Sequence, residues 1–155
     1  MKFIVTRELG RLAKWLRIIG FDTVYVTQIN SGSLIIQALR DGCIILTRNH
    51  RLPKSAGARI MLLESERIKE QLQEVLHKLH LNPQPETMFI RCTICNEVLK
   101  RVDKGSVKTQ VPEYVFRTQE DFFSCPKCSR VYWQGTHWGN VKEALKEIAA
   151  NPKSQ

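Results

Sequence analysis

Four cysteines in the last third of the chain form two pairs, with two residues between the members of each pair. The pairs are Cys92 with Cys95 and Cys125 with Cys128. Zinc prefers four soft ligands in a tetrahedron, and two intervening residues let one tight turn aim both sulfur atoms at the same ion. Four thiolates leave no open position for water, so the pattern predicts a structural zinc ion. Two disulfides, or a redox C-x-x-C motif, are the alternatives.

Basic side chains gather where two predicted strands of the N-terminal half end. The first strand ends at Thr6, and the third is followed by Asn49. In an open parallel sheet, ligands bind beyond the carboxyl ends of the strands, at the point where the strand order reverses. If the two strands are neighbours, we expect Thr6 and Asn49 to face each other there, beside the N-terminus of a helix that favours anions. The candidate phosphate-binding residues are Arg7, Arg11, Lys14, Arg48, His50, Arg51 and Lys54. A solvated basic face without a ligand is the alternative.

Carboxylates are scarce at the same strand ends. A metal-dependent nuclease needs two or three of them to hold magnesium or manganese, which activates water and stabilises charge on the phosphate. Thr6 and Asn49 are neutral, and so are Asn30 and Ser31 at the start of the second predicted helix. Glu8 is the closest acid, in a first helical turn where a carboxylate is as well suited to the helix dipole.

The overall charge favours a polyanionic partner. The chain of 155 residues has 24 lysines and arginines against 15 acids, which gives a formal net charge of +9. Nucleic acid is the first expectation for such a partner and an acidic membrane surface the second. No apolar run is long enough to span a bilayer, and the N-terminus does not resemble a signal peptide. We therefore expect a cytoplasmic protein, in which paired cysteines serve as metal ligands more often than as disulfides.

The N-terminal half alternates between apolar strands and amphipathic helices. This alternation predicts right-handed crossovers, a parallel sheet and a small three-layer α/β domain. Ser31 or Ser33 is a candidate N-cap of the second helix. Cys43 begins a continuous apolar run and is expected to be a small buried hydrophobic residue. The predicted strands are 3–5, 24–26, 43–47 and 59–63, and the predicted helices are about 9–19, 34–39, 65–80 and 139–149.

Six segments, in order along nearly the whole chain, resemble a known family. They are 10–17, 20–23, 45–48, 92–95, 111–115 and 125–137. The family is the Mut-seven C-terminal family, a PIN-like ribonuclease domain that carries a zinc ribbon. The resemblance implies an α/β fold with a PIN-like domain at 1–81, a linker at 82–89, a zinc ribbon at 90–138, and a C-terminal helix and tail at 139–155. It also implies RNA as the substrate class and a divalent-metal active site.

The acids that the resemblance implies are missing at their matching positions. The family pattern has acids at the positions of Thr6 and Asn49, and a third near the start of the second helix, where Asn30 stands. Neutral oxygens alone would hold a divalent ion weakly. We therefore expect an RNA-binding or ribonucleoprotein-binding member whose nuclease activity is weakened or lost, a pseudoenzyme.

Two other functions stay open. An active ribonuclease, dependent on magnesium or manganese, would use a rearranged site with Glu8, Asp22 or His50. A protein-interaction module would dock a partner through the ribbon. Its aromatic residues could form that surface or stack bases; packing of the ribbon against the α/β domain is the alternative, favoured for Trp133. These residues are Tyr132, Trp133, His137 and Trp138.

Overall fold

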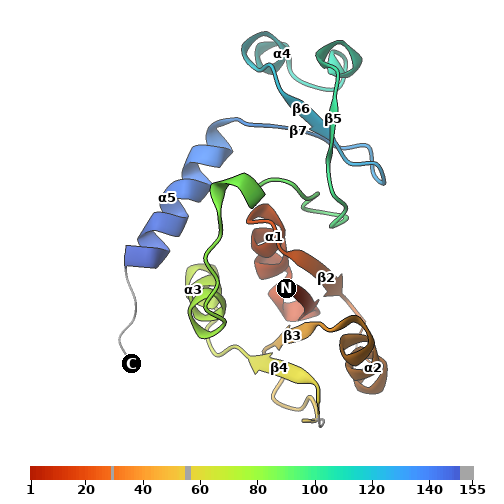
Figure 1. Ribbon diagram of the computed structural model, residues 1–155, viewed down its shortest axis with the longest axis vertical. Helices are drawn as coiled ribbons and strands as arrows, with labels where there is room; N and C mark the ends of the chain where they lie inside the picture. The colour runs from red at the N-terminus through yellow and green to blue at the C-terminus, as the bar shows by residue number, and fades with distance from the viewer. Residues whose placement is uncertain (29, 55–56, 151–155) are drawn as a thin grey trace.

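A four-stranded parallel sheet lies in the lower half of the molecule as drawn in Figure 1. The computed structural model describes residues 1–28, 30–54 and 57–150. The strands are β1 (Lys2–Thr6), β2 (Asp22–Val26), β3 (Ile44–Thr47) and β4 (Arg59–Leu62). Their order is β2-β1-β3-β4, and every neighbouring pair is parallel. The predicted parallel α/β sheet is confirmed.

Helices cover both faces of the sheet because the central strands are apolar on both. Phe3 and Val5 of β1 face the core formed with α1 (Gly10–Ile18) and α3 (Ile68–Lys78). Ile4, between them, faces the opposite core with α2 (Ser31–Asp41), as the two-residue period of a strand requires. The three predicted layers are therefore present.

The helices start and end close to the predicted positions. A short 3₁₀ turn, η1 (Arg7–Leu9), precedes α1. The N-cap of α2 is Asn30, whose Oδ1 accepts a hydrogen bond from the Ser33 amide at 3.1 Å, so the expectation of Ser31 or Ser33 as the cap was wrong. Cys43 lies just before β3 and is buried, as expected.

The cysteine-containing region forms a separate three-stranded antiparallel sheet, at the top of Figure 1. Its strands are β5 (Lys100–Val102), β6 (Phe122–Ser124) and β7 (Val131–Trp133), in that order. The 3₁₀ turn η3 (Lys104–Val107) and helix α4 (Glu113–Thr118) lie between β5 and β6. Val107, Val111 and Phe122 form its small core.

The segment between the two sheets lies against the α/β domain. It contains the 3₁₀ turn η2 (Pro85–Thr87). The amide of Phe89 donates to the carbonyl of Ile18 at the end of α1, at 2.7 Å. The Phe89 ring stacks on Trp138, with 4.5 Å between the ring centroids. Trp138 belongs to α5 (Thr136–Ala150), which returns to the α/β core through Val141 and Ile148.

Gly20 permits this close approach. It has a φ of +99°, and a Cβ atom there would collide with the carbonyl oxygen of Thr87. Glycine adopts this conformation without steric penalty, and its missing side chain leaves room for the neighbouring backbone.

No helix among the described residues is long and apolar enough to cross a membrane.

We predict that Gly20→Ala lowers the free energy of unfolding by more than about 2 kcal/mol, since backbone strain and a backbone collision add together. Gly42→Ala is the matched control, because Gly42 has a φ of +64° but a Cβ atom added there would have nothing within 4 Å. This control measures the free-energy cost of the positive φ alone, about 1–2 kcal/mol. Urea unfolding of both variants measures the difference; equal losses would mean that the Thr87 backbone is not held against Gly20.

Candidate functional site

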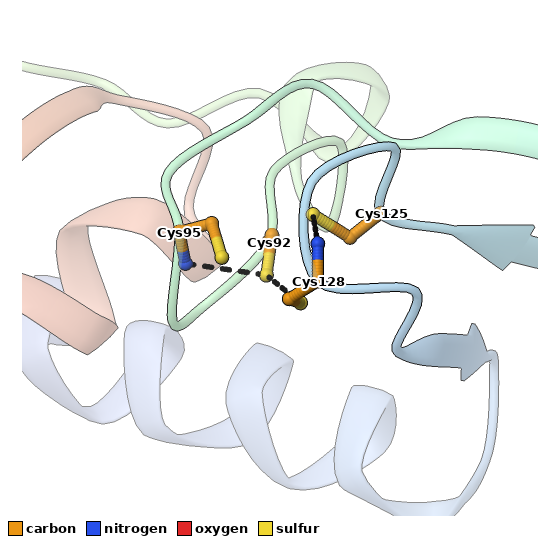
Figure 2. Close-up of side chains that lie close together, drawn as sticks. All are labelled: Cys92, Cys95, Cys125 and Cys128. Atoms are coloured by element: carbon orange, nitrogen blue, oxygen red, sulfur yellow. Dashed lines mark hydrogen bonds between the residues drawn. The ribbon is translucent and has the colours of Figure 1, made fainter.

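The four paired cysteines converge on one point, as Figure 2 shows. Their Sγ atoms all lie within 4.8 Å of one another, although the two pairs come from different loops of the ribbon. Cys92 and Cys125 are buried, and Cys95 and Cys128 are partly exposed. All four thiols are free, so the two-disulfide alternative does not describe this structure.

The two pairs sit in turns of identical hydrogen bonding. The amide of Cys92 donates to Glu97 O at 2.8 Å, and the amide of Asn96 donates back to Cys92 O at 3.0 Å. In the second turn, the amide of Cys125 donates to Arg130 O, and the amide of Ser129 donates back to Cys125 O, both at 2.9 Å. The residue after each second cysteine, Asn96 or Ser129, has a positive φ, of 68° or 61°.

This geometry fits a tetrahedral metal ion. A metal–sulfur distance of about 2.3 Å places sulfur ligands about 3.8 Å apart, and Cys92 Sγ and Cys128 Sγ are 3.7 Å apart. In each turn the amide of the second cysteine donates to the sulfur of the first, at 3.3 Å for Cys92 and 3.5 Å for Cys125. Such N–H···S bonds stabilise thiolates. The four cysteines can therefore hold a metal ion and fill its four coordination positions, which leaves no open position for catalysis.

Cys92 is prepared for a metal by its surroundings. Burial on its own raises the pKa of this thiol, but the Tyr132 hydroxyl and the amides of Cys95 and Ile94 outweigh it and lower the pKa to about 6. The Tyr132 hydroxyl lies 3.1 Å from Cys92 Sγ. The thiolate is the form that binds metals.

A second site lies at the carboxyl ends of β1 and β3, where a pocket of about 740 Å³ opens. It contains three of the predicted basic residues and one acid. Its lining residues are Arg7, Glu8, Thr27, Gln28, Ser31, Arg48, Asn49 and Arg51.

One carboxylate oxygen joins the two strand ends. Glu8 Oε1 accepts hydrogen bonds from Thr6 Oγ1 at 2.5 Å, Thr47 Oγ1 at 2.9 Å and the Arg48 amide at 2.8 Å. Thr6 and Thr47 have no exposed surface, and their hydroxyls are 2.9 Å apart. The side chain that meets Thr6 is therefore Thr47 rather than Asn49. The one signal for Thr47 that sequence reasoning could have used is its place at the end of the apolar run of β3.

Asn49 lies one step beyond this contact. Its backbone amide donates to Thr47 Oγ1, and its side-chain Oδ1 accepts from the Arg51 backbone amide, both at 3.0 Å. Its side chain thus holds the turn that presents Arg48 and Arg51 to the pocket.

The hydrogen bonds keep Glu8 ionised. Burial on its own raises the pKa of this carboxyl, but the bonds from Thr6, the Arg48 backbone and Thr47 outweigh it and hold the pKa below its ordinary value. Glu8 is therefore an acceptor that ties β1 to β3, at a position where it also reduces the positive charge of the pocket.

The other predicted residues are spread over a wider surface. Asn30 caps α2 on the pocket side, with its side chain exposed. His50 is exposed, 3.9 Å from Glu64. Asp22 lies at the amino end of β2, opposite the pocket, where it accepts a hydrogen bond from Asn96 Nδ2 at 2.7 Å. Four of the predicted basic residues do not line the pocket, and all four are exposed: Arg11, Lys14, His50 and Lys54.

The aromatic residues of the ribbon do not share one surface. The ring of Trp133 packs on Phe122 inside the ribbon core, 6.5 Å between centroids, so its expected packing against the α/β domain was wrong. Tyr132 contacts Cys92, and Trp138 stacks on Phe89. The side chain of His137 lies outside the described residues.

A hollow of about 760 Å³ lies elsewhere, between α3, the 81–88 segment and α5. Its floor is apolar, formed by residues such as Leu76, Met88 and Leu145, and it contains none of the predicted site residues. Charged residues also line this hollow, among them Glu74, Lys78, Lys142 and Lys146.

We predict that Glu8→Ala lowers the free energy of unfolding by roughly 1–3 kcal/mol, because the buried hydroxyls of Thr6 and Thr47 lose their acceptor. Glu8→Gln keeps an acceptor oxygen and should lose less. Because the folded-state pKa of Glu8 is lowered, its charge stabilises the fold above the ordinary carboxyl pKa, and this contribution disappears as the pH falls through the folded-state value. Urea unfolding of wild type and Glu8→Gln should therefore converge in acid; a gap that widens in acid would contradict the assignment.

The comparisons with known proteins agree with this architecture. The family model described as the Mut7-C RNAse domain matches residues 1–145. No curated protein and no solved structure gives a significant match. The match covers both the parallel sheet with its pocket and the ribbon with its four cysteines. The chain therefore belongs to the Mut7-C RNAse domain family.

Proposed function

We propose that this protein binds RNA through the pocket at the carboxyl ends of β1 and β3, and that its metal-dependent nuclease activity is weakened or lost. One observation carries the proposal. The pocket is lined by three arginines and a single acid, and one oxygen of that acid already accepts three hydrogen bonds.

The arginines suit phosphate groups. A guanidinium presents a planar fork of donors that matches phosphate oxygens, and it stays charged at any physiological pH. Arg7 and Arg51 are exposed at the pocket. Arg48 is held beside them by an Nη2 bond to Glu66 Oε1 at 3.2 Å, and its buried Nε has no hydrogen-bond partner within the described residues.

The strand ends are poorly suited to a divalent cation. Magnesium is usually bound through one or two carboxylates together with waters and substrate phosphates. Here Thr6 and Thr47 present hydroxyls that are already bonded to Glu8. Asn30 and Asn49, at the other positions where the family resemblance implies acids, are uncharged amides whose oxygens accept backbone hydrogen bonds.

An active ribonuclease that uses Glu8 is the second candidate. The observation in its favour is that Glu8 is ionised and lines the pocket beside the arginines. Manganese or magnesium would then be held by one protein carboxylate and the RNA phosphates. Removal of the Glu8 charge distinguishes the two functions. If the protein only binds RNA, the change should strengthen binding; if the protein is a nuclease, the change should abolish cleavage.

The four-cysteine group would hold zinc as its structural ion. The all-sulfur tetrahedral arrangement suits zinc, and free thiols suit a reducing compartment such as the cytoplasm. Its bound metal would keep the ribbon folded, because the ribbon core is small. Metal analysis of the purified protein tests this; one zinc per chain is the expected content.

We predict salt-sensitive binding of single-stranded RNA. Three phosphate contacts at about 0.7 of a counterion each imply a roughly 20-fold loss of affinity between 50 and 200 mM salt. Arg51→Gln should weaken binding and flatten the salt dependence, and Glu8→Gln should tighten binding several-fold. Arg40→Gln is the matched control, since Arg40 is exposed and paired with Asp41 in the last turn of α2. Electrophoretic mobility shifts measure the RNA affinity of the wild type and of the three variants. An affinity that does not depend on salt would refute the proposal.

We predict that a generic RNA is not cleaved faster with magnesium or manganese than with EDTA. The Thr6→Asp, Asn49→Asp double variant should bind manganese at least tenfold more tightly, because the carboxylate introduced at position 6 would stand beside that of Glu8. Thr6→Asn with Asn49 unchanged is the neutral control. Calorimetric titration with manganese and a gel assay for cleavage check both statements. Wild-type turnover that EDTA and Glu8→Gln both abolish would favour the second candidate.

A further inference from the structure

Arg17 is a buried cation between the two sheets. It belongs to the last turn of α1, and only 6% of its surface is exposed. Its Nε donates to Thr23 O at 2.9 Å, and its Nη1 donates to Thr93 O at 2.8 Å and Ile94 O at 2.9 Å. No ion pair joins Arg17 to a carboxylate in the part of the chain that the structure describes. The Asp22 carboxylate acts on Arg17 only from beyond ion-pair distance. Because a buried charge without a direct opposite partner is unfavourable, this environment favours a further anion near Arg17.

The two carbonyls that Arg17 contacts lie in the first cysteine turn. Thr93 and Ile94 are the residues between Cys92 and Cys95. The carbonyl of Ile94 shares a peptide group with the Cys95 amide, which donates to Cys92 Sγ at 3.3 Å. The carbonyl of Thr93 shares a peptide group with the Ile94 amide, which also bonds to Cys92. Both peptide dipoles therefore have their negative ends at Arg17 and their positive ends at the Cys92 sulfur.

A metal-loaded cluster supplies such a further anion. Four thiolates around one divalent ion carry a formal net charge of about −2. We propose that Arg17 is the counter-charge of this metal–thiolate centre, and that it stabilises the Cys92 thiolate through the two intervening peptide groups. This inference rests on the proposed metal binding by the four cysteines, and it assigns to a residue of the α/β domain a role in the metal affinity of the ribbon.

The two cysteine turns differ in this respect. The second turn has the same backbone bonds, but its intervening residues, Pro126 and Lys127, are exposed. The first turn is docked at the amino end of β2. Asn96 Oδ1 accepts from the Thr23 amide at 2.9 Å, while Arg17 bonds to the carbonyl of the same residue.

Metal binding and docking are therefore linked. Whatever tightens the contact of Arg17 with the first turn also favours the charged cluster, and the linkage is reciprocal. Loss of the metal removes much of the negative charge of the cluster, which weakens the docking of the ribbon on α1 and β2.

The test compares Arg17→Gln, which removes the charge, with Arg17→Lys, which keeps it. Zinc affinity of the full chain is measured by competition with a chromogenic chelator. Groups outside the ligand sphere typically change metal affinity 10–100-fold, so Arg17→Gln should lose that factor and Arg17→Lys should retain most of the affinity. Asn96→Gly is the matched control: it keeps the positive φ and removes the docking contacts with Asp22 and Thr23, but not the peptide groups at Cys92.

Cobalt substitution gives the readout that a purely structural role would not change. The sulfur-to-cobalt charge-transfer band should shift to lower energy in Arg17→Gln, because the thiolate is less stabilised, and should stay in place in Asn96→Gly. If Arg17→Gln does not fold, Arg17→Lys and hydrogen exchange of the zinc-loaded wild type decide, with the Ile94 and Cys95 amides expected among the slowest of the ribbon.

Three outcomes would overturn the proposal: zinc affinity of Arg17→Gln within twofold of wild type, equal losses in Arg17→Gln and Asn96→Gly without a band shift, or rapid exchange of the Ile94 and Cys95 amides. A wild-type chain that binds neither zinc nor cobalt would instead refute metal binding itself.

Discussion

Burial of the central strands on both faces is the constraint from which the rest of the architecture follows. Phe3, Ile4 and Val5 of β1 have no exposed surface, and the residues of β3 are buried almost as completely. Apolar groups on both faces require helices on both faces, and parallel strands require crossovers long enough to supply them. The crossovers bring the carboxyl ends of β1 and β3 together. Polar groups at those ends then need partners, and Glu8 supplies one acceptor for both threonines.

The structure shows how one acid serves a strand end from which the expected acids are absent. The resemblance to the family implies carboxylates that repel one another unless a cation lies between them. In this chain Thr6 is a neutral donor, and Glu8 accepts a hydrogen bond from it. Both threonine hydroxyls at the strand ends find their acceptor within the protein, at Glu8. Three arginines line the pocket beside it, and for that reason we propose that the pocket is an anion site.

Local patterns predicted much of this molecule. The apolar runs at 3–5 and 43–47 predicted the central strands, because continuous burial leaves a signal that needs no knowledge of the partners. The two C-x-x-C pairs predicted the group of four cysteines that can hold a metal ion, because zinc geometry restricts the spacing within each turn. Asn30 was missed as a cap, although it precedes the two serines and asparagine is an equally good N-cap.

Contacts between distant segments were beyond this reasoning. Nothing near Arg17 in the sequence indicates that its guanidinium meets the carbonyls of residues 93 and 94, and the helical pattern alone would place an arginine on the surface. Glu8 was weighed as a helix-dipole residue, because the 3₁₀ turn that directs it toward Thr47 has no distinct signature. Such contacts depend on how the elements pack, which short-range propensity does not determine.

The way Gly20 meets the backbone of Thr87 has a consequence for recognition. Together with the Phe89–Trp138 stack, it makes the connection between the sheets a fixed spacer rather than a tether. Two weakly binding surfaces on a rigid frame act as a bivalent ligand, whose effective local concentration depends on their separation. A chain that touched both the arginine pocket and the ribbon would be selected by its length and shape.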